Sequence, residues 1–191
     1  MKTLSTRYSD AFTYALNLHH FQYRKGTRVP YIAHLMSVSA LILENGGDED
    51  QAIAGLLHDA VEDQGGIKTL EEIRSRFGDR VANIVERCSD SYTLFKPPWR
   101  ERKELYLAEL ARADKDIRLV SLADKVHNTR SLLWDLQQYG SAVWKRFNGG
   151  KEGTLWYYRA LVDFFIDGEQ TPLVCELNRV VSEIEQLARE E

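Results

Sequence analysis

Apolar residues recur at intervals of three and four along most of this chain, and no run of alternating β-branched residues interrupts the pattern. Such spacing places apolar side chains along one face of a helix. Four prolines and several glycine clusters divide the pattern into segments of helical length. We therefore predict an all-α fold, a helical bundle of about eight to ten helices.

Turn and capping residues predict where these helices begin and end. Pro30 suits the first turn of a helix that the Asn45-Gly46-Gly47 cluster would end. Two capping boxes, in which Gln or Glu follows a capping side chain by three residues, would open the next two helices. They are Asp48 with Gln51 and Thr69 with Glu72. Further helices are expected over 81–88, about 99–113, 117–136, 154–166 and, at the C-terminal end, 172–188.

Composition narrows the class of protein. The length of 191 residues fits one domain, 1–191, and the 43% of hydrophobic residues supplies a core. The net charge of −4 argues against a surface for bulk nucleic-acid binding but leaves room for a local basic pocket. There is no signal peptide, apolar membrane span or CxxC pattern. We expect a soluble, cytoplasmic protein with no membrane segment and no nucleic-acid partner.

The most informative segment places His58 and Asp59 in the middle of an apolar helical pattern. A buried, unpaired carboxylate is costly, so it needs a metal, a cation or strong hydrogen-bond donors. Glu62 lies four residues after His58, and Asp63 lies four after Asp59. At helical spacing all four side chains would spread across one side of a single helix.

Two other apolar stretches contain the same irregularity. His34 occupies one of them, and Asp124 occupies the other, with Asn128 one turn later. Alone, each would be read as an ordinary core or edge residue. As a set, two imidazoles and two carboxylates suit a metal site that leaves positions open for water and substrate. The predicted metal ligands are His34, His58, Asp59 and Asp124.

The order of these residues resembles the H…HD…D signature of the HD phosphohydrolase superfamily. Three segments are more specifically similar to the RelA/SpoT-type hydrolase domain, and the resemblance covers about residues 7–165. They are His20-Phe21-Gln22-Tyr23-Arg24-Lys25 with Pro30-Tyr31-Ile32-Ala33-His34, Gly55-Leu56-Leu57-His58-Asp59-Ala60-Val61-Glu62-Asp63, and Leu122-Ala123-Asp124-Lys125-Val126-His127-Asn128. Because the resemblance covers nearly the whole sequence, we expect the layout of the stand-alone small alarmone hydrolases, without a synthetase or regulatory domain.

This resemblance implies Mn²⁺-dependent hydrolysis of the 3′-pyrophosphate of a (p)ppGpp-like alarmone of the stringent response, with release of pyrophosphate. The four ligands carry over to the histidines and aspartates already named. The family's catalytic acidic pair matches Glu62 and Asp63. Its nucleotide-contacting positions match Arg24, Lys25 and Asn128.

Other residues near these motifs are candidates for the same pocket. Arg102, Lys103 and Lys151 supply positive charge for substrate phosphates. The run Trp156-Tyr157-Tyr158 could belong to the core or form a stacking platform for a base. His19 does not match the signature, and we expect it to be structural or to support the site.

Two alternatives to this function remain open at this stage. One is an HD phosphatase acting on another nucleotide, such as a ppApp-type alarmone or the 2′-phosphate of NADPH. The other is a non-catalytic nucleotide sensor, which is disfavoured because the four ligand residues and the acidic pair are all present. The sequence leaves open the base, the physiological metal and the oligomeric state.

Overall fold

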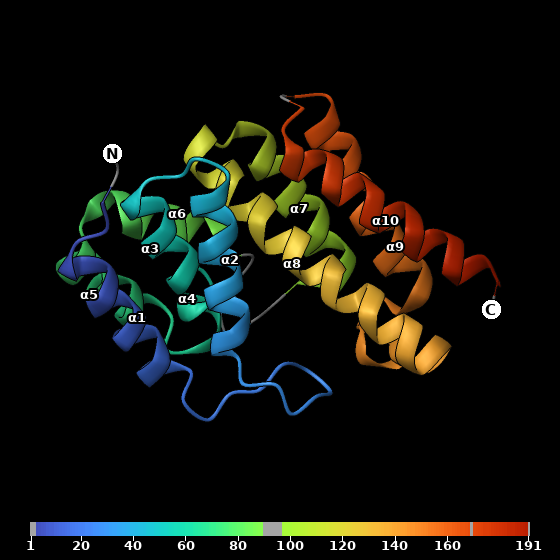
Figure 1. Ribbon diagram of the computed structural model, residues 1–191, viewed down its shortest axis with the longest axis horizontal. Coiled ribbons are helices and arrows are strands. Elements are labelled where there is room, and N and C mark those ends of the chain that lie inside the picture. Colours follow the sequence, from blue (N-terminus) through green and yellow to red (C-terminus); the bar gives the residue numbers. More distant parts are fainter. Residues whose placement is uncertain (1–2, 90–96, 169, 191) are drawn as a thin grey trace. The chain divides into compact units, whose positions relative to one another are not determined.

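The computed structural model describes residues 3–89, 97–168 and 170–190. These residues form ten α-helices and one 3₁₀ helix, η1, and contain no β-strand, which confirms the all-α prediction (Figure 1). The helices are α1 (Thr6–Leu18), α2 (Ile32–Glu44), α3 (Glu49–Leu57), α4 (Ala60–Asp63), α5 (Ile67–Phe77), α6 (Asp79–Cys88), α7 (Trp99–Arg112), α8 (Lys115–Tyr139), η1 (Gly140–Arg146), α9 (Gly150–Ile166) and α10 (Pro172–Glu190). None of these helices combines the length and the apolar character needed to cross a bilayer.

The chain forms two compact units. The first consists of Met1–Lys96 with Arg112–Ala123, and the second consists of Pro97–Ala111 with Asp124–Glu191. Helix α8 is continuous and contributes its first turns to the first unit and the rest to the second. The single-domain assignment made from the sequence stays a prediction.

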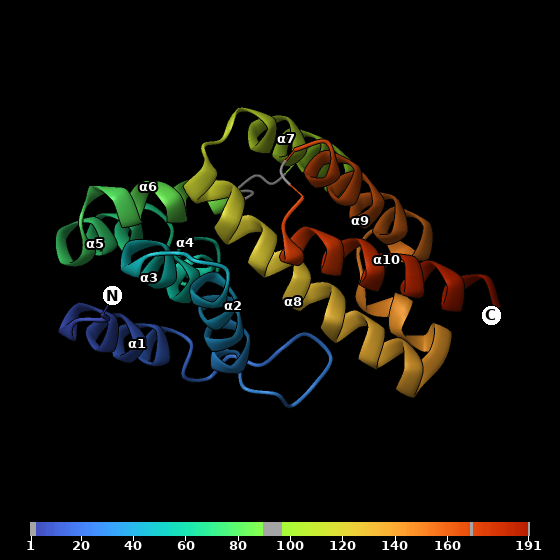
Figure 2. The same cartoon turned by 45° about the horizontal axis from the view of Figure 1, so that its top comes forward.

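The core of the first unit forms where α2 and α3 pack side by side (Figure 2). Gly55 allows this close approach, since a Cβ there would lie 2.5 Å from Ile42 Cδ1 and 3.3 Å from Ser39 Cα. The Ser39 hydroxyl donates a hydrogen bond to the Ala52 carbonyl at 2.9 Å, which joins the two helices at the same level. Because α2 carries His34 and α3 leads directly into His58, this packing also positions two of the predicted ligands.

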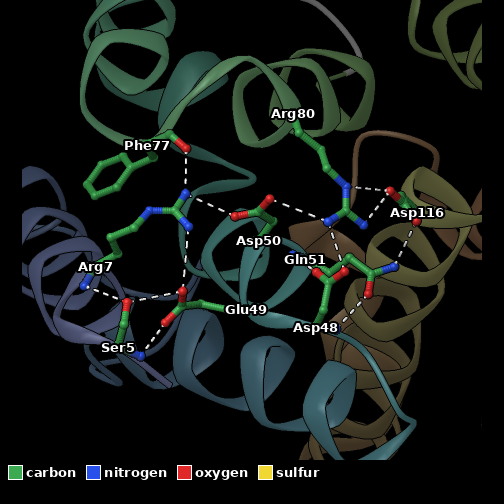
Figure 3. Close-up of polar contacts among 9 residues, drawn as sticks. All are labelled: Ser5, Arg7, Asp48, Glu49, Asp50, Gln51, Phe77, Arg80 and Asp116. Atoms are coloured by element: carbon green, nitrogen blue, oxygen red, sulfur yellow. Dashed lines mark hydrogen bonds and ion pairs between the residues drawn. The ribbon is translucent and has the colours of Figure 1, made fainter. Parts of the chain in front are cut away.

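The N-terminus of α3 is held by the predicted capping box, which the structure confirms. The Gln51 backbone N–H donates to Asp48 Oδ1 at 3.1 Å, and the Asp48 N–H donates to Gln51 Oε1 at 2.7 Å. Arg80 of α6 joins this cap to the start of α8, with its guanidinium 2.8 Å from Asp48 and 2.7 Å from Asp116 (Figure 3). Isolated exposed ion pairs contribute little to stability, but one guanidinium shared by several carboxylates holds α6, the N-terminus of α3 and the start of α8 together.

Arg7 of α1 forms a second connection to the same end of α3. Its guanidinium contacts Asp50 at 2.9 Å and the Phe77 carbonyl at 2.7 Å (Figure 3). The Ser5 backbone N–H donates to Glu49 and lowers the pKa of that carboxyl below its usual value. The contact therefore stabilises the fold at neutral pH, and its contribution is lost as the pH falls through the lowered pKa.

The second unit consists of α7, the remainder of α8, η1, α9 and α10. Arg159 of α9 binds Glu185 of α10 through two hydrogen bonds, of 2.9 and 2.6 Å. Arg130 of α8 binds Glu176 of α10 in the same way, at 2.7 Å for both bonds. The apolar face of α10 is buried against these helices. Bidentate pairs of this kind fix the orientation of the helices as well as their spacing.

The aromatic run on α9 belongs mainly to this core. Tyr157 and Tyr158 are buried, at 6% and 8% exposure, whereas Trp156 is half-buried. The Arg100 guanidinium lies 3.1 Å from the centre of the Trp156 ring. Trp99 packs edge-on against both Trp156 and Tyr157.

Several predicted helix bounds are wrong. Helix α6 begins at Asp79 rather than at 81, and α8 spans Lys115–Tyr139 rather than 117–136. Helix α5 begins at Ile67 after Gly66, whose φ is 62°, so Thr69 is not its cap, and its hydroxyl donates instead to the Gln64 carbonyl at 2.8 Å. Helix α9 begins at Gly150 rather than at 154: the Gly153 N–H already donates to the Gly149 carbonyl at 3.1 Å, and the Trp99 ring packs against both glycines. Helix α10 continues to Glu190, two residues beyond the predicted end.

Gly55→Ala should destabilise the first unit by about 1–3 kcal/mol, because the added methyl must displace Ile42 at a close helix contact. Urea unfolding followed by circular dichroism measures this loss. Gly168→Ala is the matched control, since a Cβ there has only ordinary contact, 3.5 Å from the Phe165 carbonyl oxygen. Equal stability of the two variants would contradict the role given to Gly55.

Candidate metal centre

Three ligand atoms converge in the first unit. The two imidazole Nε2 atoms of His34 and His58 are 3.3 Å apart, and Asp59 Oδ2 lies 3.5 Å from the first and 3.1 Å from the second. The histidines are 1% and 3% exposed, while the Asp59 side chain is 25% exposed. Ligands about 2.1 Å from one ion and separated by 90–110° lie about 3.0–3.4 Å from each other. The donor set and its spacing therefore fit a divalent metal ion.

The His58 ring is oriented by the backbone. Its Nδ1 is 2.9 Å from the Gly55 carbonyl oxygen, so Nδ1 carries the proton and donates it. In the neutral ring Nε2 then keeps its lone pair, and Nε2 is the atom that faces His34 and Asp59. A second hydrogen bond of this kind fixes the tautomer and the direction of a metal-binding histidine.

The helix is interrupted at the two central residues, which corrects the prediction of a single continuous helix. Helix α3 ends at Leu57 and α4 begins at Ala60, leaving His58 and Asp59 in a turn. The His58 ring takes the Gly55 carbonyl, which is the acceptor that a continuing helix would offer to the Asp59 backbone. The interruption lets Asp59 reach the histidines while Glu62 and Asp63 follow on α4.

Tyr31 supports the Asp59 carboxylate. Its hydroxyl donates to Asp59 Oδ2 at 2.6 Å. Burial and the nearby Asp59 charge raise the pKa of Tyr31, so the phenol stays protonated and remains a donor. The ring stacks on His19 with centroids 5.2 Å apart, and its edge meets His34 at 5.5 Å. This contact is not predictable from the sequence, where Tyr31 is only one residue of the motif that ends in His34.

The acidic pair lies on the short helix α4. Glu62 is half-buried and Asp63 is exposed. Asp63 Oδ2 accepts a hydrogen bond of 2.7 Å from the Gln22 side-chain amide. Gln22 comes from the segment after α1, so the catalytic pair predicted from one segment is contacted by another that lies 41 residues away in the sequence.

The loop between α1 and α2 carries the predicted substrate-binding residues Arg24 and Lys25. It folds back on itself through the backbone bonds Arg24 N–H to Val29 O and Tyr31 N–H to Gln22 O, both 2.9 Å. The Arg24 guanidinium lies 5.7 Å from the centre of the Tyr31 ring, and Lys25 is exposed. The same folded loop thus carries both cations and supplies the side chains that contact Asp59 and Asp63.

The second unit contains the other predicted site residues. Asp124 is buried, and its two oxygens accept from Asn128 at 2.5 Å and from Lys125 at 2.6 Å. Burial disfavours the charged form of Lys125, but the attraction of Asp124 outweighs it and raises the pKa of the lysine well above its usual value. Asp124 is therefore held as an oriented carboxylate, as a metal ligand requires. Its role as a ligand stays a prediction.

The three additional cations predicted for substrate binding lie in the second unit as well. Arg102 and Lys103 are half-buried on α7, and the Lys103 ammonium lies 5.0 Å from the centre of the Tyr157 ring. Lys151, in the first turn of α9, donates to the Ala188 carbonyl near the end of α10. This contact gives Lys151 a structural task that competes with binding a phosphate.

The sequence matches the family described as HD domain over residues 11–155. The chain belongs to the HD-domain family.

Several curated proteins are similar in sequence to this HD domain. The protein named guanosine-3′,5′-bis(diphosphate) 3′-pyrophosphohydrolase MESH1 is 40% identical over 126 residues in Xenopus tropicalis, which is 64% of this chain and 68% of that protein. The human protein of the same name is 36% identical over equal shares. A Synechocystis protein named probable guanosine-3′,5′-bis(diphosphate) 3′-pyrophosphohydrolase is 39% identical over 125 residues, 64% of this chain but only 16% of its own length.

Two solved structures resemble the HD domain described here. One, of a metazoan ortholog of SpoT described as hydrolysing ppGpp and acting in starvation responses, has a TM-score of 0.77 at 27% identity and covers 96% of this chain and 98% of its own. The other, from Listeria monocytogenes, has a TM-score of 0.70 at 30% identity and covers 80% of this chain and 99% of its own.

Tyr31→Phe should weaken Mn²⁺ binding about tenfold, because Asp59 loses the donor that orients it. Isothermal titration calorimetry with Mn²⁺ measures the change in affinity. Tyr23→Phe, on the same loop and 57% exposed, is the control and should bind the metal as the unaltered protein does. Unchanged affinity in Tyr31→Phe would show that the phenol does not support the ligand.

Proposed function

We propose that this HD domain is a phosphohydrolase that removes the 3′-pyrophosphate from a (p)ppGpp-like alarmone and releases pyrophosphate. The observation that carries the proposal is the convergence of His34, His58 and Asp59 within 3.1–3.5 Å. The names of the MESH1 relatives support the same activity. The substrate bound at the site would then be a small nucleotide.

The proposed metal is Mn²⁺, held by His34, His58 and Asp59 with Asp124 as the fourth protein ligand. A bound divalent ion would lower the pKa of a coordinated water and polarise a phosphoryl oxygen. The remaining chemistry belongs to side chains of the chain itself.

Glu62 is the proposed base that orients and deprotonates the attacking water, and Asp63 supports its geometry. The oxygen of the water forms a bond to the phosphorus that is attached to the 3′ oxygen of the ribose. The bond between that phosphorus and the 3′ oxygen breaks, and pyrophosphate is released from the nucleotide. Negative charge on the phosphoryl oxygens requires cations nearby. The folded loop presents Arg24 and Lys25 for this purpose. Asn128 is the proposed nucleotide contact of the second unit, with Arg102, Lys103 and Lys151 as further candidates.

Pyrophosphate or phosphate release from ppGpp, ppApp and NADPH, with and without Mn²⁺, tests the activity and identifies the base. We expect Mn²⁺-dependent release of pyrophosphate from a 3′-pyrophosphorylated nucleotide. Glu62→Gln should lower kcat about 10²–10⁴-fold, as expected for the loss of a general base. Glu71→Gln, on the exposed face of α5, is the matched control and should retain full activity.

Each result of this assay has a defined meaning. Release from NADPH alone would replace the alarmone by a 2′-phosphorylated nucleotide. No turnover of any substrate, with metal still bound, would favour a nucleotide sensor. Full activity of Glu62→Gln would remove Glu62 from the mechanism.

The metal can be tested without any substrate. Mn²⁺ at about 100 times its Kd should raise the free energy of unfolding by about 2.7 kcal/mol, because it binds only the folded site. Asp59→Asn should abolish most of this gain, since a neutral amide replaces the charged ligand. Thermal or urea unfolding with and without Mn²⁺ measures it, and an equal gain in both proteins would place the metal elsewhere.

A further inference from the structure

The Gln22 carboxamide lies at the centre of a hydrogen-bond network beside the acidic pair. Its Nε2 donates to Asp63 Oδ2 at 2.7 Å. Its Oε1 accepts from His19 Nδ1 at 2.7 Å and from Gln64 Nε2 at 2.6 Å. Both polar atoms of one side chain are therefore engaged, and one of them contacts a proposed catalytic residue.

The chemistry of the neighbours determines which way the amide points. An ionised Asp63 can only accept hydrogen bonds, so it must face the Gln22 NH₂ group. The Gln22 oxygen then faces His19 and Gln64, and each of these must donate to it. A rotated amide would place an oxygen against the carboxylate and an NH₂ group against two donors. One orientation satisfies every group.

His19 is held in the state that this network requires. It is 3% exposed, and burial lowers its pKa, so the ring is neutral. Its Nε2 is buried without a hydrogen-bond partner among the described residues, which suits the tautomer with the proton on Nδ1. Stacking against Tyr31, with an interplanar angle of 17°, fixes the ring plane. His19 is thus a fixed donor to Gln22.

The backbone joins this network to the metal site. The Tyr31 N–H donates to the Gln22 carbonyl at 2.9 Å, so the two residues are paired across the folded loop. The side chain of Tyr31 holds Asp59, and the side chain of Gln22 holds Asp63. The loop that carries Arg24 therefore fixes one ligand carboxylate and one catalytic carboxylate together.

We propose that Gln22 is a positioning residue for the hydrolysis, acting through Asp63. Its carboxamide, oriented by His19 and Gln64, fixes the position of the Asp63 carboxylate through Oδ2. The proposal rests on the proposed function in one respect, namely that Asp63 assists the reaction.

Gln22→Glu is the sharpest test, because it keeps the shape of the side chain and replaces the donor to Asp63 by a second carboxylate. At pH 8 we expect kcat to fall about 10- to 100-fold, the cost of losing a hydrogen bond to a charged group. KM and the affinity for Mn²⁺ should stay close to those of the unaltered protein, because no ligand or phosphate contact changes.

The pH profile separates positioning from a general structural defect. Asp63 and His19 are the titratable groups that contact Gln22. Two carboxylates this close disfavour each other's ionised form, so the introduced group gains a proton at a raised pKa as the pH is lowered. Its O–H then replaces the lost donor, and the deficit in kcat should narrow as the pH is lowered from 8 to 6. A deficit that is constant across this range would overturn the proposal.

Two further variants control for the substitution itself. Gln64→Glu removes one donor to the Gln22 oxygen, and we expect a smaller loss of kcat in the same direction. Gln138→Glu makes the same chemical change on the exposed face of α8 and should leave kcat unchanged. An unaltered kcat in Gln22→Glu, or a loss seen only in KM, would contradict positioning through Asp63.

An NMR measurement tests the contact without any turnover. The side-chain NH₂ signal of Gln22 is assigned by its absence in Gln22→Glu, and it should move upfield in Asp63→Asn, where the charged acceptor is lost. This shift in a protein that turns over no substrate would uphold the contact while the proposed function fails. No shift would overturn the inference even in an active enzyme.

Discussion

Two imidazole rings are buried where α2 meets the end of α3, and a carboxylate lies beside them. Polar and charged side chains are tolerated at the edge of an apolar core only when a cation or a full set of hydrogen bonds compensates for their lost hydration. Several features of the first unit position these side chains. Gly55 lets the two helices approach, and its carbonyl fixes the tautomer of His58. The helix breaks after Leu57, so that Asp59 turns toward the rings.

The folded loop between α1 and α2 carries residues proposed to bind the nucleotide and residues that contact the carboxylates of the site. It carries the two cations proposed for the nucleotide, and it sends Tyr31 to one carboxylate and Gln22 to another. Substrate binding on this loop would therefore act on groups that already position the reacting centre. At the opposite end of α3, Arg7 and Arg80 hold the first turn against its neighbours. Helix α3 is thus fixed at both ends, which suits a site that needs its ligands held within tenths of an ångström.

Membership of the HD-domain family and the convergence of three ligands agree with a hydrolytic site. The acidic pair on α4, which follows His58 and Asp59, is the proposed source of the base that a metal site alone does not provide. In the second unit the carboxylate of Asp124, the predicted fourth ligand, is oriented by Asn128 and Lys125. Tyr157 and Tyr158 are buried, so these two residues of the aromatic run belong to the core of the second unit.

The sequence by itself determined the all-α class and several helix bounds, and it predicted the metal ligands, because these follow from local patterns. A histidine or aspartate in an apolar helical run is conspicuous without any structure, and the capping box at Asp48 is complete within four residues. Tertiary structure decided the rest. The contact of Gln22 with Asp63 joins residues 41 positions apart, through a loop that has no periodicity to read. The glycines at the start of α9 pack against the Trp99 ring, which lies far earlier in the sequence, and the break at His58 depended on a side chain that competes with the backbone for one carbonyl. Which of these contacts form is decided by tertiary packing, and the local spacing of residues in the sequence carries no information about it.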